Sequence, residues 1–239
     1  MPETQSPTAL TLENVTAGYG QTHILRDLSL TIARGERIAV IGRNGAGKTT
    51  MLSTIMGLTR LHGGRVHLGD ENISQLSPHQ RSMRGLGLVP QTRDIFPSLT
   101  VEENLTAVMR GRTSLEEAYA LFPRLKERRR NGGTQLSGGE QQMLTIARTL
   151  MTEPDVILLD EPLEGLAPVI CEQLMRAFEQ LAADGRRTLV LVEQHAAAAL
   201  AFATRAIIIT NGAIVYDGSA AALKQQPDLL ERHIGVAHG

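Results

Sequence analysis

The chain has 239 residues, of which 42% are hydrophobic, 21% charged and 3% aromatic, and its formal net charge is −1. This composition excludes a disordered chain, and the near-zero charge argues against a protein that grips nucleic acid through bulk electrostatic attraction. A single cysteine cannot form an internal disulfide, and no stretch approaches the roughly 20 apolar residues that span a bilayer, so we expect a cytoplasmic globular protein.

The first 35 residues place an apolar residue at every second position over two short stretches. Leu10 and Leu12 share one face of the first stretch, and Leu28, Leu30 and Ile32 share one face of the second. A period of two is typical of half-buried strands. We therefore expect an antiparallel β part at the N-terminus.

The rest of the chain alternates short apolar runs with helical segments. Each run is an unbroken stretch of Val, Ile, Leu and Ala, which suits a strand that is buried on both faces. The alternation predicts an α/β fold with a mostly parallel core sheet, and Asn211-Gly212 predicts a hairpin turn. The expected strands are residues 38–41, 86–89, 156–159, 189–192, 206–209 and 214–216, and the expected helices are residues 48–58, about 168–183 and an Ala-rich segment after residue 192.

Residues from about 97 to 150 differ from the rest, because they contain no apolar strand run. Segments 100–103 and 114–117 both match the capping box that begins a helix, and a third helix begins near Glu140. We expect one domain over residues 1–239, with this helical subdomain inserted into it. The basic residues between Arg124 and Arg130 lack interleaved aromatic residues, which predicts a solvated surface rather than a nucleic-acid interface.

Residues 42–49 read GRNGAGKT, a complete GxxxxGK[ST] phosphate loop between an expected strand and an expected helix. The glycines let successive N–H groups turn inward around an anion, and the positive end of the helix points at the same phosphates. Lys48 is then placed to bridge the β- and γ-phosphates, and the Thr49 hydroxyl is placed to bind Mg²⁺. A merely connecting turn would not need these residues, so we predict a nucleotide site.

Two adjacent carboxylates, Asp160 and Glu161, end the apolar run 156–159. The carboxyl edge of a parallel sheet is where such folds bind their ligands. Asp160 is suited to hold Mg²⁺ through its waters, which leaves Glu161 free to act as the general base on the attacking water. An acidic pair alone would fit a solvated turn, but the phosphate loop upstream favours a catalytic pair.

A second candidate anion site lies at residues 136–140, which read LSGGE at the start of an expected helix. Ser137 suits the N-cap position, and Gly138 and Gly139 leave backbone N–H groups uncovered. A glycine-containing helix start is usually structural when it stands alone. Two candidate phosphate-binding elements in one chain therefore need an explanation.

The order and spacing of these motifs resemble the ATPase subunit of ABC transporters. The resemblance rests on the phosphate loop, Gln91, the LSGGE motif, Asp160-Glu161 and His195, and it covers essentially the whole chain. It implies a P-loop NTPase fold of the ABC type that hydrolyses ATP with Mg²⁺. In such proteins two cassettes face head to tail, and each ATP lies between one phosphate loop and the LSGGE motif of the other subunit.

The same resemblance implies roles for individual residues. Tyr19 matches the aromatic residue that stacks on adenine, Gln91 the glutamine that contacts Mg²⁺ and water, and His195 the histidine that contacts the γ-phosphate. The implied catalytic residues are Lys48, Glu161 and His195, and the implied metal ligands are Thr49, Gln91 and Asp160. The implied ATP-binding residues are Tyr19, Gly42, Asn44, Gly45, Gly47, Lys48, Thr49, Thr50, Gln91, Ser137, Gly138 and Gly139.

Segments 87–91, 95–105, 121–125 and 164–168 resemble one of the two ATPase subunits of bacterial branched-chain amino acid importers. This finer resemblance implies a peripheral protein on the inner face of the cell membrane, bound to integral membrane permease subunits through residues 97–104. Its further implied partners are a second ABC ATPase subunit, identical or different, and indirectly a periplasmic or extracellular solute-binding protein. Nucleic acid is not an implied partner.

Other functions stay open at this stage. The solute of the importer is a branched-chain or other hydrophobic amino acid, or alternatively urea, a short amide or an aromatic acid. A soluble ABC ATPase outside transport is a further alternative, and so is a cassette that binds ATP without hydrolysing it. The intact Lys48, Asp160, Glu161 and His195 argue against the last of these. A small P-loop kinase is disfavoured because it would have no use for the LSGGE motif.

Overall fold

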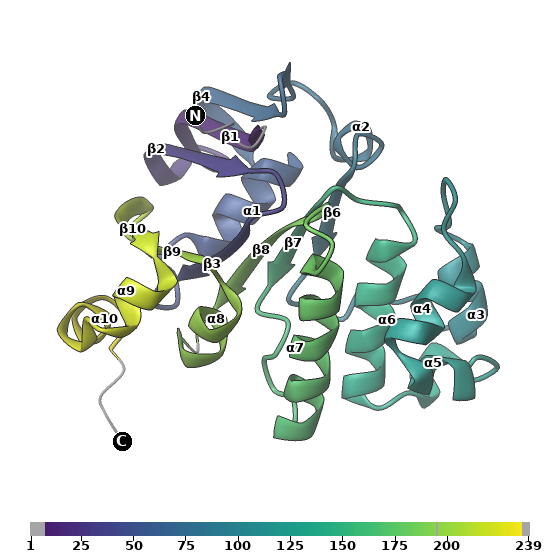
Figure 1. Cartoon of the computed structure of the whole chain (residues 1–239). Coiled ribbons are helices and arrows are strands. Elements are labelled where there is room, and N and C mark those ends of the chain that lie inside the picture. The colour runs from purple at the N-terminus through teal and green to yellow at the C-terminus, as the bar shows by residue number, and fades with distance from the viewer. Residues whose placement is uncertain (1–7, 195, 236–239) are drawn as a thin grey trace, which may run out of the picture.

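The computed structural model describes residues 8–194 and 196–235, which fold around two β-sheets flanked by helices (Figure 1). The larger sheet has six strands in the order β10-β9-β3-β8-β7-β6. Its strands are β3 (Arg37–Ile41), β6 (Leu86–Val89), β7 (Val156–Asp160), β8 (Thr188–Glu193), β9 (Arg205–Thr210) and β10 (Ala213–Ser219).

The larger sheet confirms the expected mostly parallel core. Strands β9, β3, β8, β7 and β6 run parallel, and β10 adds an antiparallel edge through the hairpin at Asn211-Gly212. Every residue of β7 and β8 is buried, because helices or the second sheet cover both faces. The topology therefore brings the carboxyl ends of β3, β8, β7 and β6 to one edge, side by side.

The smaller sheet is antiparallel, with the strand order β2-β1-β4-β5. It confirms the N-terminal β part, and it also contains two strands that the sequence pattern did not indicate. Strand β4 has the sequence RLHGGRVHL, whose two glycines interrupt the apolar alternation, so its extended form depends on pairing with β1. The strands are β1 (Thr8–Tyr19), β2 (Thr22–Ala33), β4 (Arg60–Leu68) and β5 (Glu71–Asn72).

Two apolar cores hold these layers together. One lies between the two sheets and includes Met51, Leu52 and Ile55 of α1, and the other lies on the opposite face of the larger sheet, beneath α6, α7 and α8 (Figure 1). The helices outside the 97–150 region are α1 (Lys48–Met56), α2 (Pro78–Ser82), α7 (Pro168–Ala182), α8 (Ala196–Phe202), α9 (Ala220–Lys224) and α10 (Pro227–Ile234).

Between β6 and β7 the chain is helical, at the right of Figure 1. The capping box at Thr100 is confirmed, whereas at Ser114 the described residues show only half of one, the bond from the Glu117 N–H to the Ser114 hydroxyl. That these helices form a subdomain of one domain stays a prediction. They are α3 (Val101–Thr106), α4 (Leu115–Leu121), α5 (Pro123–Glu127), the 3-10 turn η1 (Gly133–Gln135) and α6 (Gly138–Leu150).

Helix length and hydropathy bear on membrane insertion. Among residues 8–194 and 196–235, none of the helices combines the length and the apolar character needed to cross a bilayer.

Candidate nucleotide-binding and hydrolysis site

The phosphate loop connects β3 to α1, as its chemistry requires. Gly47 has φ of 109°, which strains residues with a side chain, and a Cβ on Gly42 would lie 2.4 Å from the carbonyl oxygen of Ile209. The Lys48 ammonium folds back over the loop and donates to the carbonyls of Gly42 at 2.9 Å and Arg43 at 3.3 Å. The loop therefore folds around the Lys48 ammonium, which its own carbonyl groups bind.

Lys48 also pairs with Glu161 across the sheet edge. The distance from Lys48 Nζ to Glu161 Oε1 is 3.2 Å, and the two side chains are only 4% and 6% exposed. Glu161 has φ of 45°, in the left-handed region that non-glycine residues seldom occupy. Buried charges are tolerated when they are paired, so this ion pair allows both side chains to be buried.

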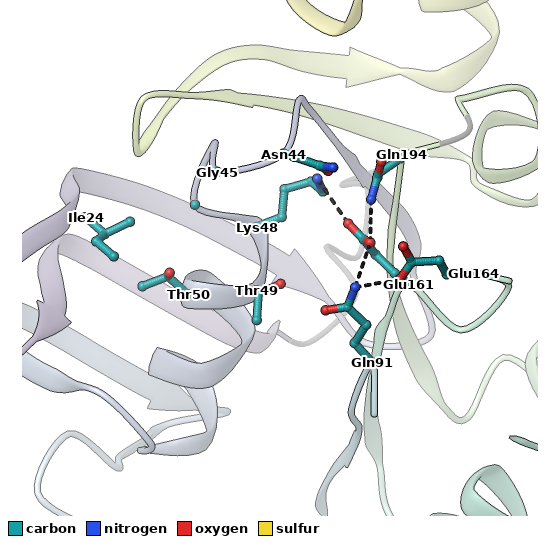
Figure 2. A pocket seen from close by; sticks show the side chains of 11 residues that line it. Ile24, Asn44, Gly45, Lys48, Thr49, Thr50, Gln91, Glu161, Glu164 and Gln194 are labelled. Atoms are coloured by element: carbon teal, nitrogen blue, oxygen red, sulfur yellow. Dashed lines mark hydrogen bonds and ion pairs between the residues drawn. The ribbon is translucent and has the colours of Figure 1, made fainter. Parts of the chain in front are cut away.

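The second carboxylate oxygen of Glu161 accepts two side-chain amides, as Figure 2 shows. Gln194 Nε2 lies 2.7 Å from Glu161 Oε2, and Gln91 Nε2 lies 3.3 Å from the same oxygen. The Gln91 amide also donates to Glu164 Oε2 at 2.6 Å. Glu161 is thus held by a lysine on one oxygen and by two glutamines on the other.

Asp160 lies beside the phosphate loop rather than in solvent. The Thr49 hydroxyl donates to Asp160 Oδ1 at 3.1 Å. Burial raises the pKa of Asp160 to about 6, against the lowering effect of the Thr49 hydroxyl. A nearby cation would reverse this shift, because it would favour the ionised carboxylate.

The oxygen atoms of Thr49 and Asp160 suit a magnesium ion. Magnesium keeps several of its waters and takes one or two protein carboxylates together with substrate phosphates. Within the described part of the chain, no cluster of three or more His, Cys, Asp or Glu side chains could hold a metal. The hydroxyl of Thr49 and the carboxylate of Asp160 are oxygen donors that fit Mg²⁺ bound together with a nucleotide.

These groups surround a cleft of about 280 Å³ at the edge of the larger sheet (Figure 2). Eight of the sequence-predicted site residues line it. Gly42 and Asp160 do not line it, but they accept hydrogen bonds from two residues that do, Lys48 and Thr49. The complete lining is Ile24, Asn44, Gly45, Gly47, Lys48, Thr49, Thr50, Gln91, Glu161, Glu164 and Gln194.

Four residues near this site were not predicted from the sequence: Ile24, Glu164, Glu193 and Gln194. Glu193 and Gln194 stand at the carboxyl end of the expected strand 189–192, which is a sequence signal that they belong to the ligand-binding edge. In the structure this strand, β8, lies between β3 and β7, so its carboxyl end meets the same cleft. Glu193 is 2% exposed, and its Oε1 accepts the backbone N–H of Leu163 at 3.2 Å. Burial raises the pKa of Glu193 to about 7, although the Leu163 N–H favours the charged form.

The LSGGE segment lies outside this cleft, at the start of α6. Ser137 caps the helix, and the bonds run both ways: Glu140 N–H donates to the Ser137 hydroxyl at 3.3 Å, and Ser137 N–H donates to Glu140 at 2.8 Å. A Cβ on Gly138 would lie 2.6 Å from Arg93 Nη1, and one on Gly139 would lie 3.0 Å from a methyl carbon of Ile170. The two glycines therefore have close neighbours that leave no room for side chains.

The basic run is largely exposed, as predicted, and two of its arginines also contact α6. Arg124 and Arg128 are 49% and 38% exposed, and their Nε atoms lie 2.9 and 3.3 Å from Glu140 Oε1. Burial opposes the ionisation of Glu140, but the bonds from Ser137 and Arg124 hold its pKa below its usual value. The run fixes the N-terminus of α6, which the sequence could not reveal because the contact joins separate helices.

Tyr19, the predicted adenine contact, is not joined to the cleft. Tyr19 lies at the end of β1, beside the hairpin to β2, with 49% of its surface exposed, and it does not line the cleft. His195 lies outside the described residues. Their predicted roles toward adenine and the γ-phosphate stay predictions.

The fold and the motifs define an ATP-binding cassette ATPase, and comparison with known proteins agrees. A profile of the ABC transporter family matches residues 25–164, and the chain belongs to that family. ATPase subunits of this family bind ATP or ADP, dimerise and work with membrane permeases.

Several relatives match over nearly their whole length. The high-affinity branched-chain amino acid transport ATP-binding protein BraG of Pseudomonas aeruginosa is 39% identical over 95% of this chain and 99% of that protein. A probable branched-chain amino acid transport ATP-binding protein, LivF of Archaeoglobus fulgidus, is 36% identical over 92% and 96%. The lipopolysaccharide export ATP-binding protein LptB of Escherichia coli is 33% identical over 95% and 97%.

Solved structures show the same fold. A nucleotide-free ATP-binding cassette of an ABC transporter superposes with a TM-score of 0.82 at 24% identity, over 97% of this chain and 100% of that one. A dimeric ATP-binding cassette in a post-hydrolysis state, bound to ADP and Pi, gives a TM-score of 0.78 at 28% identity, over 88% and 98%.

Proposed function

We propose that this chain is the MgATP-hydrolysing subunit of an ABC importer for branched-chain or other hydrophobic amino acids. The observation that carries the hydrolytic part is the cleft itself. There the lysine of the phosphate loop, the Thr49–Asp160 pair and Glu161 converge from two separate segments of sequence. An arrangement of this kind supports in-line attack of water on a bound γ-phosphate.

Nucleotide binding begins with an exchange of partners. The Lys48 ammonium leaves Glu161 and binds the β- and γ-phosphates, while the N–H groups of Gly45 and Gly47 surround the anion. Thr49 and Asp160 would hold Mg²⁺, which would supply charge neutralisation at the phosphates. The exchange frees one oxygen of Glu161.

Glu161 then acts as the general base. Its carboxylate accepts the proton of the water that attacks the γ-phosphorus, as the bond from that phosphorus to the β–γ bridging oxygen breaks. Gln91 would orient the same water and contact Mg²⁺. We infer that Ser137, Gly138 and Gly139 contact the nucleotide held by the second subunit. Loss of the γ-phosphate then removes an anion that both subunits bind.

The transport assignment rests on relatives rather than on the cleft. Two proteins named for branched-chain amino acid transport share 39% and 36% identity with this chain, compared with 33% for the lipopolysaccharide export protein. We therefore place the chain on the cytoplasmic face of the membrane, in a homo- or heterodimer, with residues 97–104 contacting permease subunits. A solute-binding protein would act on the permease from the other side.

Uptake into vesicles tests this assignment. The complete complex, purified with the membrane subunits that accompany the chain, is reconstituted and supplied with a solute-binding protein and internal MgATP. We expect uptake of leucine, isoleucine or valine that is lost with Glu161→Gln. Uptake of none of these, together with ATP-dependent uptake of urea or a short amide, would contradict the amino-acid assignment while leaving the ATPase assignment intact.

A further inference from the structure

Three groups hold the carboxylate of Glu161, and they are not equivalent. Lys48 binds Oε1 at 3.2 Å, Gln91 binds Oε2 at 3.3 Å, and Gln194 binds Oε2 at 2.7 Å (Figure 2). The last of these has a distance typical of a strong, charge-assisted hydrogen bond. Gln194 therefore makes the shortest of the three contacts, from the segment directly after β8.

Under the proposed function, two of these groups have other tasks once nucleotide is present. Lys48 turns to the phosphates, and Gln91 turns to the metal and the attacking water. Gln91 is also shared in this structure, because its amide lies nearer to Glu164 than to Glu161, at 2.6 Å against 3.3 Å. Among the described residues, Gln194 alone of the three makes no second side-chain hydrogen bond, so its amide stays available to Glu161.

The backbone around Gln194 is fixed to the segment that carries Glu161. The Glu161 N–H donates to the carbonyl of Val192 at 3.0 Å, and the Leu163 N–H donates to the carboxylate of Glu193 at 3.2 Å. Consecutive residues at the end of β8 therefore hold residues 161–163 by backbone and side-chain bonds. A side chain next to a hydrogen-bonded strand end, as Gln194 is, positions its partner better than a side chain on a free loop.

We propose that Gln194 is a positioning residue for Glu161, whose amide holds one carboxylate oxygen and thereby aims the other at the attacking water. The amide donor cannot take the proton itself, so Gln194 acts through Glu161 and not on the substrate. This inference rests on the proposed role of Glu161 as the base. It adds the residue that directly follows β8 to a cleft whose other partners of Glu161 follow β3 and β6.

The test uses variants of nearly equal size. Gln194→Met keeps the length of the side chain and removes the donor, and Gln194→Glu keeps its shape and replaces the donor with a like charge. Steady-state phosphate release is measured on the full-length chain, with KM and MgATP binding determined in parallel. Gln225→Met, at the exposed C-cap position of α9, is the matched control.

We expect kcat to fall about tenfold or more in Gln194→Met and further in Gln194→Glu, because a well-placed general base contributes about 10²- to 10⁴-fold. KM and the MgATP dissociation constant should stay within about twofold of wild type, since substrate binding does not use this amide. Gln225→Met should match wild type. A structural defect would instead change the binding constant and the melting temperature together with kcat.

A double-mutant cycle separates this inference from the proposed function. If Gln194 acts through Glu161, adding Gln194→Met to Glu161→Gln causes no further loss of kcat. A Gln194→Met enzyme with wild-type kcat, beside an inactive Glu161→Gln enzyme, would overturn the role of Gln194 alone. A Glu161→Gln enzyme with wild-type kcat would overturn both the general base and the residue that positions it.

Discussion

At the scale of single residues, Lys48 and Glu161 form an ion pair that holds the two predicted catalytic side chains against each other. Both are almost fully buried, so each charge depends on the other for compensation. Removal of one partner from a buried ion pair costs about 3–5 kcal/mol, because the remaining charge is left without a counterion. Phosphate groups are well suited to replace Glu161 as the partner of Lys48, and this exchange couples binding to release of the base.

The first prediction concerns that exchange. Lys48→Met should weaken MgATP binding by at least about tenfold, since the variant lacks the cation that binds the β- and γ-phosphates. It should also lower the free energy of unfolding, because Glu161 loses its counterion. Titration with a fluorescent ATP analogue measures the affinity, with exposed Lys224→Met as control. Equal affinity in Lys48→Met and Lys224→Met would rule out the phosphate role.

The second prediction concerns Glu193, whose pKa is raised from an ordinary 4.5 to about 7 by burial. The folded chain then binds a proton that the unfolded chain has released between these values, so the stabilisation is lost as pH rises through about 7. The difference in unfolding free energy between wild type and Glu193→Gln should therefore fall by on the order of 2–3 kcal/mol from pH 5 to pH 8.

Urea unfolding of the two proteins at several pH values measures this difference. Other titrating groups, including Asp160, are present in both chains, so their contributions cancel. A difference that stays constant with pH, or one that grows as pH rises, would contradict the buried, proton-binding state of Glu193.

At the scale of elements, the N-terminus of α6 depends on Glu140. This side chain accepts the Ser137 N–H and also two arginines from the region of α5, so one carboxylate fixes both the cap and the neighbouring helix. Caps of this kind contribute about 1 kcal/mol. Because Arg124 and Arg128 are partly exposed, their ion pairs with Glu140 contribute less to stability than the cap does.

The third prediction follows from this geometry. Glu140→Gln keeps an oxygen that accepts the Ser137 N–H, whereas Glu140→Ala removes it. Both variants should be less stable than wild type, with Glu140→Ala lower than Glu140→Gln by about 1 kcal/mol in urea unfolding. Wild-type stability in Glu140→Ala would show that the capping box does not support α6.

At the scale of the whole molecule, the site is a consequence of strand order. Because β3, β8, β7 and β6 are neighbouring parallel strands, residues that follow them meet at one edge of the sheet although they are far apart in sequence. The phosphate loop follows β3, Gln194 follows β8, Glu161 follows β7 and Gln91 follows β6. The LSGGE segment belongs to a different surface, which fits a site completed by a second subunit.

The parallel core, the antiparallel N-terminal part and the convergence of Lys48, Thr49 and Glu161 could be predicted from sequence, because local apolar runs and short motifs specify them. Strand β4 could not, since its extended form depends on pairing with β1. The contacts of Gln194 with Glu161 and of Arg124 with Glu140 also could not, because each joins separate elements with no local pattern. These are the contacts that tertiary packing creates.

The central claim is that this chain hydrolyses ATP with Glu161 as the general base, between two cassettes. Steady-state phosphate release by Glu161→Gln, compared with wild type under saturating MgATP, tests it most directly. We predict that the variant binds MgATP, loses turnover by at least about 10²-fold and accumulates as an ATP-dependent dimer. Turnover at the wild-type rate in this variant would contradict the claim.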